Sequence, residues 1–334
     1  MIVDVHAHGL SEEFIIAATK DPHGWRVEVA APRQYIAADY GPLDPLLYDV
    51  EGRIASLRRR DVALQLISPP PPLVAAPEHA ADAAMARVLN SSTAKLVSDC
   101  NGLLAGLAAP AVGEPERAAD ELRRAVETHR FPGVMLPSSA KDRALDDPAF
   151  ASLFATIEEM ELFVFMHPTG SYLSAGLQDF TLPIIVGWPT ETSVAVARLI
   201  FSGTLRRHPR LKLVLAHGGG TLPYLLGRLD LAYSAPYHEA NPACHAHIAR
   251  PPSHYLRQLY FDSAVLNPKT LGFLIDEMGP DRVLFGSDFP YEIGDSDGAI
   301  AVASLQSAPA HTREAVLSGN ARRLLDRKLT SAMR

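Results

Sequence analysis

Short apolar runs rich in β-branched residues recur along the chain, and most are followed by a longer stretch whose apolar residues repeat at helical spacing. This alternation is typical of βα units, which place their strands in one parallel sheet. Strands are predicted at Ile2–His6, Val62–Ile67, Gly102–Ala108, Gly133–Leu136, Leu162–His167, Lys212–His217, Leu259–Asp262 and Arg282–Ser287. Eight strands in sequence favour an α/β protein built as a (β/α)8 TIM barrel.

The helical stretches favour the same architecture, because each follows a predicted strand. The clearest helices are predicted at Glu78–Asp99, Glu114–Thr128, Asp147–Met160, Pro189–Arg207 and Thr312–Asp326. No repeat or convincing domain boundary interrupts this order. We therefore expect residues 1–334 to form a single barrel domain.

Two segments depart from the alternation. The segment from about residue 12 to about residue 50, which contains WRVEV around Val27, predicts a small insertion after the first strand. Thr169–Gly187 follows the fifth strand and is a long loop of the kind that forms lids. Both segments come after strand carboxyl ends, so they are expected on the active-site face of the barrel.

Composition narrows the class of protein. Hydrophobic residues make up 47% of the chain and charged residues 21%, which is typical of a globular enzyme. The net charge of −7 and the lack of a long basic run argue against a nucleic-acid partner. Cys100 and Cys244 make no disulfide framework, and no window approaches the roughly 20 apolar residues that cross a bilayer. We expect a cytoplasmic protein without a membrane partner.

Ionisable residues stand at the ends of several predicted strands. His6 and His8 alternate on the first strand, so their side chains point to the same side. His167, His217 and Asp288 each follow an apolar run directly. At one face of a barrel these five side chains would converge, and burying them without a cation would be costly. Imidazole nitrogen with carboxylate oxygen predicts one Zn²⁺, and Mn²⁺ or Fe²⁺ suits similar ligands.

The fourth strand, GVMLPSS, has no lysine that could bridge two ions, so a single ion is expected. With His6, His8, His167 and Asp288 as its ligands, His217 remains free beside the metal-bound water. The ion would lower the pKa of that water toward about 7, and a neutral imidazole could take its proton. His217 and Asp288 are therefore the candidate catalytic residues.

The arginines and glycines near the predicted site indicate their roles less specifically than the histidines and Asp288 do. The GGG that follows His217 is expected to allow close packing of the turn rather than to hold a phosphate. Arg228 lies eleven residues after His217, about three turns along a helix, so it would be too far from its own metal and could reach a neighbouring subunit. Arg53 begins the basic segment RIASLRRR, whose other arginines predict a solvated face.

Motifs along the whole chain resemble one family. HAH, HPTG, AHGGG, LGRLD, RPPSHYLRQLYFDSAVLNP and DRVLFGSDFPYEIG are similar to the amidohydrolase-related, metal-dependent decarboxylases typified by α-amino-β-carboxymuconate-ε-semialdehyde decarboxylase. The resemblance is densest from Arg207 to Gly294. It implies the same zinc ligands as above, with His217 activating the metal-bound water.

The resemblance also implies how a substrate is held. Arg53 would bind a substrate carboxylate, and Arg228 would bind another in the neighbour's site across a homodimer interface. Tyr291 and Phe180 match positions that line the pocket. Phe180 stands where a tryptophan is usual, and Pro236 stands where the decarboxylase carries a further arginine, so the particular acid is open.

The predicted function is non-oxidative decarboxylation of a planar unsaturated or aromatic carboxylic acid, with Arg53 and the partner subunit's Arg228 clamping the carboxylate and His217 relaying the proton. The alternative within the same superfamily is a metal-dependent hydrolase or hydratase that acts on a lactone, an amide or an unsaturated acid. A third possibility is a non-catalytic barrel whose metal is structural or which only binds a ligand. A closed structural site would lack the unused His217 and the open coordination position.

Overall fold

A computed structural model of the protein describes residues 1–20, 27–37, 41–71, 82–140, 143–170, 176–177, 179–234 and 237–325. Its main sheet has eight strands that all run parallel and follow the order of the sequence, which confirms the predicted barrel. The strands are β1 (Ile2–His8), β5 (Val62–Ser68), β6 (Leu104–Ala108), β7 (Gly133–Pro137), β10 (Phe163–His167), β11 (Lys212–Leu215), β12 (Tyr260–Asp262) and β13 (Val283–Leu284).

The last strand returns to the first and nearly closes the barrel. Ala7 forms an isolated parallel bridge with Phe289. The amide of Val5 donates to the carbonyl of Phe285 at 2.9 Å, and the amide of His8 donates to the carbonyl of Phe289 at 2.8 Å. The segment after β13 is therefore fixed against the carboxyl end of β1.

Strand β1 is irregular where its histidines begin. Its register against β5 shifts between Asp4 and Ala7. Val3 and Val5 pack with Phe165 in the buried cluster that includes the inward residues of the other strands, whereas Ala7 packs in the outer cluster. Because the alternation slips after Val5, the side chain of the next residue also turns inward, where its ring meets Phe165 at 4.7 Å between centroids.

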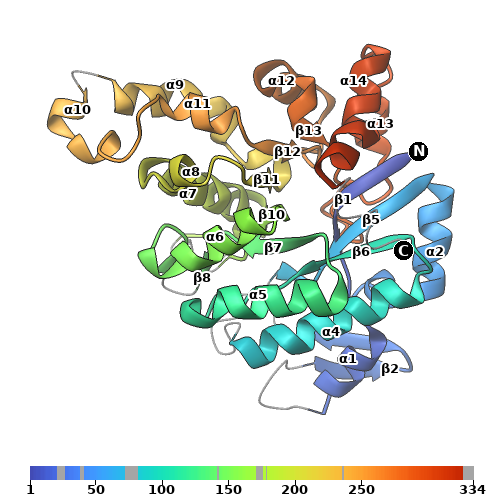
Figure 1. The fold of residues 1–334 in the computed structure, drawn as a ribbon. Coiled ribbons are helices and arrows are strands. Elements are labelled where there is room, and N and C mark those ends of the chain that lie inside the picture. The colour runs from blue at the N-terminus through green and yellow to red at the C-terminus, as the bar shows by residue number, and fades with distance from the viewer. Residues whose placement is uncertain are drawn as a thin grey trace.

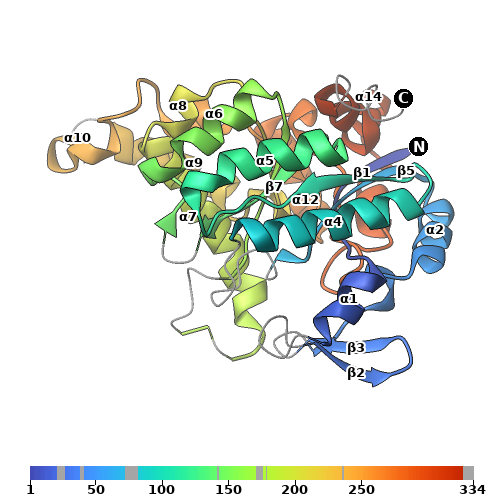
Figure 2. The ribbon, with the colours of Figure 1, turned by 60° about the horizontal axis from the view of Figure 1, so that its bottom comes forward.

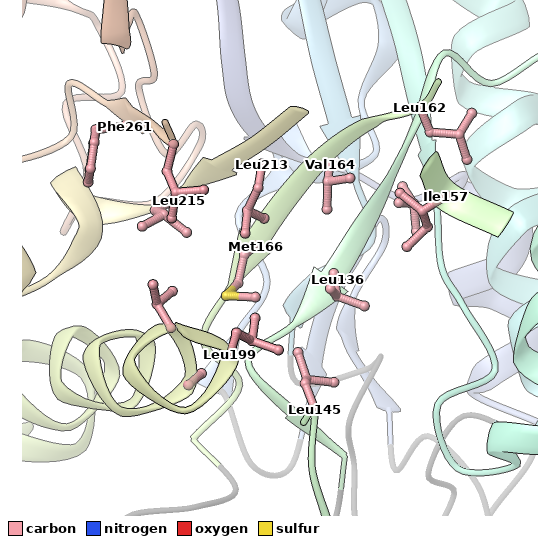
Figure 3. Close-up of a cluster of buried hydrophobic side chains, with 14 of the residues drawn as sticks. Leu136, Leu145, Ile157, Leu162, Val164, Met166, Leu199, Leu213, Leu215 and Phe261 are labelled. Carbon is pink, nitrogen blue, oxygen red and sulfur yellow. The ribbon is translucent and has the colours of Figure 1, made fainter. Parts of the chain in front are cut away.

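Helices surround the barrel (Figure 1). They include α2 (Val50–Arg59), α4 (Ala83–Asp99), α5 (Pro115–His129), α6 (Ala151–Glu159), α7 (Trp188–Phe201), α8 (Thr204–Arg207), α9 (Leu222–Tyr233), α10 (Tyr237–Ala240), α11 (Pro252–Leu256), α12 (Pro268–Met278), α13 (Ala299–Ser304) and α14 (Ala310–Glu314). Apolar side chains between sheet and helices form the outer core, where Leu199 of α7 lies against Met166 and Leu136 (Figure 3).

Some predicted boundaries were wrong. The single helix predicted over Pro189–Arg207 is two helices, because Gly203 adopts φ 75° and a side chain there would come within 2.6 Å of the carbonyl of His247. The strand predicted over Lys212–His217 ends at Leu215, since His217 has φ 55° and begins a 3-10 turn.

Other predicted boundaries fall partly outside the described residues. The helix predicted from Glu78 begins at Ala83, where the side chain of Asp82 caps it by accepting from the amide of Met85 at 2.7 Å. Glu78, Asp326 and Pro236 are not among the described residues, and neither is the middle of the predicted lid, residues 171–175 and 178.

The segment between β1 and β5 contains α1 (Glu12–Ala18) and a three-stranded antiparallel sheet of β2 (Val27–Ala31), β3 (Gln34–Ala37) and β4 (Gly41–Pro42). These elements lie together beside the barrel near α4 (Figures 1 and 2). The observed elements occupy the range in which an insertion was expected.

One helical stretch, Pro183–Phe201, is long and apolar enough to cross a membrane by length and composition, which the sequence analysis did not anticipate. Its packing identifies it as a core helix of the barrel. Val196 and Leu199 are buried in the outer core, and the carboxylate of Glu191 on the same helix is buried and hydrogen-bonded to the barrel.

Candidate active site

Four side chains meet at the carboxyl ends of the strands. His6 and His8 end β1, His167 ends β10, and Asp288 follows β13. One donor atom from each lies within 4.8 Å of the others, and all four residues are buried. The structure thus brings together the four predicted metal ligands.

The outer ring nitrogens of these histidines are engaged by the protein. Nδ1 of His6 lies 2.6 Å from Oδ2 of Asp262, and Nδ1 of His167 donates to the carbonyl of Pro168 at 2.6 Å. Nδ1 of His8 lies 3.1 Å from the hydroxyl of Ser68. Partners of this kind fix the ring orientation and leave Nε2 available to a cation.

The inner atoms make no hydrogen bond to the described residues and approach one another instead, with Nε2 of His6 3.0 Å and Nε2 of His8 3.3 Å from Oδ1 of Asp288. These atoms are Nε2 of His6, His8 and His167 and Oδ1 of Asp288. Buried polar atoms are nearly always paired, so four orphaned atoms facing one small volume require an explanation. Three imidazole nitrogens and one carboxylate oxygen are a donor set that a divalent cation fits.

The pKa shifts of His8, His167 and Asp288 favour the protonation states that bind a cation, whereas the shift of His6 does not. Burial lowers the pKa of His8 to about 4 and holds that of His167 well below its usual value, so both rings are neutral near pH 7. Burial opposes ionisation of Asp288, but the neighbouring histidines, His6 first, outweigh it and lower its pKa. Burial also lowers the pKa of His6, but Asp288 and Asp262 raise it to about 10. A cation must displace that proton.

His217 lies beside these ligands on the turn after β11. Its Nε2 is 3.6 Å from Oδ2 of Asp288, and its side chain is 17% exposed to solvent. Its ring centroid is 5.0 Å from that of His167. Gly218 and Gly220 have positive φ, and a side chain at Gly220 would come within 2.0 Å of a backbone oxygen. The glycines thus allow the close turn that places His217.

Asp262, at the end of β12, was missed by the sequence analysis. Besides contacting His6, its Oδ1 accepts from the amides of Gly218 at 2.8 Å and Ala264 at 3.2 Å. One carboxylate therefore positions both a metal ligand and the turn of His217. The sequence did carry a signal for Asp262, because it is an acidic residue at the end of a predicted strand, as the other site residues are.

Glu191 was missed as well, because nothing in its helical context marks it. It is 2% exposed, and its carboxylate accepts from the hydroxyl of Ser138 after β7 and from the amide of Gly170 at 2.8 Å. It ties α7 to the loop that follows His167. Trp188, one turn earlier on the same helix, meets the ring of His167 edge-on at 5.6 Å.

A cavity of about 310 Å³ opens beside His217 and Asp288. Its other walls are mainly apolar and include Ile184, Ile185, Trp188, Val265, Leu266 and Ile293. A larger groove of about 490 Å³ lies between α12 and α13 and contains none of the candidate residues. The smaller cavity is the one with chemistry at its wall.

The predicted substrate-binding residues are placed differently from one another. Tyr291 lies against His8, with ring centroids 5.3 Å apart, and burial raises the pKa of its hydroxyl. Phe180 is 86% exposed and is not among the residues that line the cavity. Arg228 is exposed on α9. Arg53 is fully buried, and its guanidinium donates to protein acceptors. Their assigned roles stay predictions.

A family model described as amidohydrolase matches residues 3–327. The chain belongs to the amidohydrolase family. A 2-amino-3-carboxymuconate-6-semialdehyde decarboxylase from Dictyostelium discoideum is 30% identical over 330 residues, which cover 96% of this chain and 90% of that protein. This relative confirms the resemblance seen in the sequence motifs.

Solved structures of amidohydrolase-family decarboxylases have the same fold. The 5-carboxyvanillate decarboxylase from Sphingomonas paucimobilis matches with a TM-score of 0.78 at 26% identity and covers 97% of this chain and 98% of its own. A second one, from Novosphingobium aromaticivorans, matches with a TM-score of 0.79 at 22% identity, over 98% and 96% of the two chains, and its structure holds manganese and 4-hydroxy-3-methoxy-5-nitrobenzoic acid. The relatives confirm the expected class, a carboxy-lyase of the amidohydrolase superfamily.

Proposed function

We propose that the protein is a metal-dependent, non-oxidative decarboxylase of a planar unsaturated or aromatic carboxylic acid. The observation that carries the proposal is the juxtaposition of four orphaned donor atoms with a largely apolar cavity whose wall contains His217 and Asp288. The apolar walls suit a flat hydrocarbon skeleton, and the donors suit the cation that would coordinate its oxygen atoms.

His6, His8, His167 and Asp288 would hold one Zn²⁺. Three imidazoles with one carboxylate support zinc, while the manganese in one related structure supports Mn²⁺ as the next candidate and Fe²⁺ remains a third. When bound, the cation supplies Lewis acidity, which withdraws electron density from the coordinated acid.

The chain's own residues account for the proton. When the bond to the carboxyl carbon breaks, its electron pair stays on the ring or alkene carbon, carbon dioxide leaves, and that carbon takes a proton. We assign delivery of this proton to His217, and the assignment is supported by a ring that borders the cavity and is partly exposed to solvent. Oδ2 of Asp288 lies 3.6 Å from Nε2 of this ring, and the apolar walls would limit access of water to the reacting carbon.

Recognition of the substrate would involve a second subunit. We assign a homodimer in which the partner subunit's Arg228 binds a carboxylate at this chain's cavity. The outer face of α9 supports this, since Tyr224 is 83% and Leu231 59% exposed on either side of Arg228. Tyr291 and Phe180 would complete the pocket, and Arg53 would reach a carboxylate only by exchanging its present acceptors. The two cysteines, both free, support a cytoplasmic enzyme.

The test is carbon dioxide release from the metal-loaded protein given aromatic and muconate-type acids, followed by lactones, amides and unsaturated acids with absorbance as the readout. We expect carbon dioxide from at least one acid and no hydrolysis or hydration. His217→Gln should slow release about 10²-fold or more, while His311→Gln, a change at an exposed histidine, should not. Hydrolysis or hydration as the only reaction, or full release by His217→Gln, would defeat the proposal.

A further inference from the structure

A chain of polar side chains lies buried behind the metal ligands, outside the cavity. Its members are Arg53 on α2, Gln65 on β5, Asp4 on β1 and Ser287 after β13, and none of them has measurable exposure. A buried guanidinium and a buried carboxylate are costly unless every group is paired.

At one end of the chain, Arg53 holds the backbone of a metal ligand. Its Nη2 donates to the carbonyl of His8 at 2.9 Å and to Oε1 of Gln65 at 3.0 Å. Its Nε donates to the same Oε1 at 3.2 Å, and its Nη1 donates to the carbonyl of Leu46 at 3.0 Å. The guanidinium also lies 4.9 Å above the ring of Phe289, the residue after Asp288.

At the other end, Asp4 holds the backbone of His6 and the residue that precedes Asp288. Its Oδ2 accepts from Nε2 of Gln65 at 2.8 Å and from the hydroxyl of Ser287 at 2.6 Å. Its Oδ1 accepts from the backbone amides of His6 at 3.2 Å and Ser287 at 3.1 Å. The chain of hydrogen bonds thus runs from the carbonyl of His8 to the amide of His6 and to the residue preceding Asp288.

The direction of this chain is fixed by its charges. Arg53 only donates and Asp4 ionised only accepts, so the amide between them must turn its oxygen to the guanidinium and its nitrogen to the carboxylate. Arg60 adds a second guanidinium beside the group, with its Nη1 4.0 Å from Oδ2 of Asp4, so two positive charges face one negative charge. The hydrogen-bond directions therefore allow a single arrangement, which fixes the backbone at His8, at His6 and at the residue before Asp288.

We propose that Arg53, Gln65 and Asp4 are positioning residues that set the spacing of His6, His8 and Asp288 for the cation. The inference rests on the metal centre of the proposed function. It gives Arg53 a role different from the carboxylate clamp that the family resemblance implies, and the two roles predict different losses. A clamp contributes to substrate binding, whereas a positioning residue contributes to metal binding and, through it, to turnover.

The test measures metal affinity and kinetics together. Dissociation constants for Zn²⁺ and Mn²⁺ are determined by chelator competition for the wild type, Arg53→Met, Arg53→Lys and Ser287→Ala, with Arg59→Met, at an exposed arginine of the same helix, as the matched control. For Arg53→Met we expect an affinity loss of about 10- to 100-fold, a lower kcat and a nearly unchanged KM. Arg53→Lys should recover part of the affinity, and Arg59→Met should match the wild type.

Folding is followed separately by thermal melting of the metal-free proteins. If Arg53→Met does not fold, Ser287→Ala, which removes one hydroxyl from Asp4, decides by its own loss of metal affinity. Unchanged affinity in the folded variants, or a raised KM with normal affinity and kcat, overturns the positioning role and leaves the proposed function standing. A wild type that binds neither ion overturns both.

Discussion

Asp262 offers a sharp perturbation of the metal centre because it contacts a ligand without being one. Asp262→Asn keeps the shape of the side chain, and its remaining oxygen can still accept from the amides of Gly218 and Ala264. The new amide nitrogen, however, faces Nδ1 of His6, which lies 2.6 Å from the present oxygen. Since an amide nitrogen only donates, Nδ1 must become an acceptor and the proton of the neutral ring must move to Nε2. That atom is the one that a cation requires.

The size of the effect follows from this change of tautomer. Loss of a carboxylate that orients a ligating histidine typically costs 10- to 100-fold in metal affinity, or about 1.4–2.8 kcal/mol at about 1.4 kcal/mol per tenfold. The contacts of Asp262 with the turn of His217 are retained, so the loss should isolate the contact with His6. Turnover should return in part at saturating metal.

Competition with a chromophoric chelator measures the loss for Zn²⁺ and Mn²⁺. The matched control is Asp281→Asn, at a carboxylate that is 60% exposed and pairs with Arg282. Asp281→Asn should bind metal as the wild type does. Equal dissociation constants for Asp262→Asn and the wild type would refute the argument that Asp262 sets the tautomer of His6.

Mixing inactive Arg228→Ala with inactive His217→Ala should restore about a quarter of wild-type carbon dioxide release after subunit exchange, because one site of each mixed dimer is intact; no recovery would mean self-contained sites. Glu191→Gln should lower the free energy of unfolding in urea by about 1–3 kcal/mol, because the new amide NH2 would face a buried group that now donates to the carboxylate. An unchanged urea midpoint would contradict this. Burial raises the pKa of Glu121, but Arg124 first among its partners outweighs it, so that pKa lies below 4.5. Its stabilisation is present above pH 4.5 and lost on further acidification, so Glu121→Gln should be less stable at pH 7 and show a flatter acid melting profile; a parallel profile would count against the pair.

The sequence predicts the barrel and its metal ligands well because both depend on local patterns. Buried parallel strands are continuous apolar runs, and a polar residue that ends such a run must lie at one face of the barrel. His167 and Asp288 could therefore be placed without knowing their neighbours. His6 and His8 share a face by alternation alone.

Residues whose roles depend on distant contacts could not be placed in this way. Asp262 meets His6 across 256 positions of the chain, and no local pattern pairs them. The arginines that follow Arg53 in its basic segment predict a solvated face, yet the side chain of Arg60 is 9% exposed, and Arg53 itself is fully buried. Phe180 falls in a loop with positive φ, where sequence gives no direction for the side chain. The break at Gly203 likewise depends on the approach of His247.

The metal ligands sit on both sides of the join between the first and last strands. His6 and His8 lie on the first strand of the barrel and Asp288 follows the last, and backbone contacts that include the bridge from Ala7 to Phe289 join the two strands. A cation bound by all four ligands would therefore link the first strand of the barrel to the segment after the last strand. Because residues beside both strands contribute ligands, the site is complete only when the barrel is closed, and removal of the cation should weaken that closure.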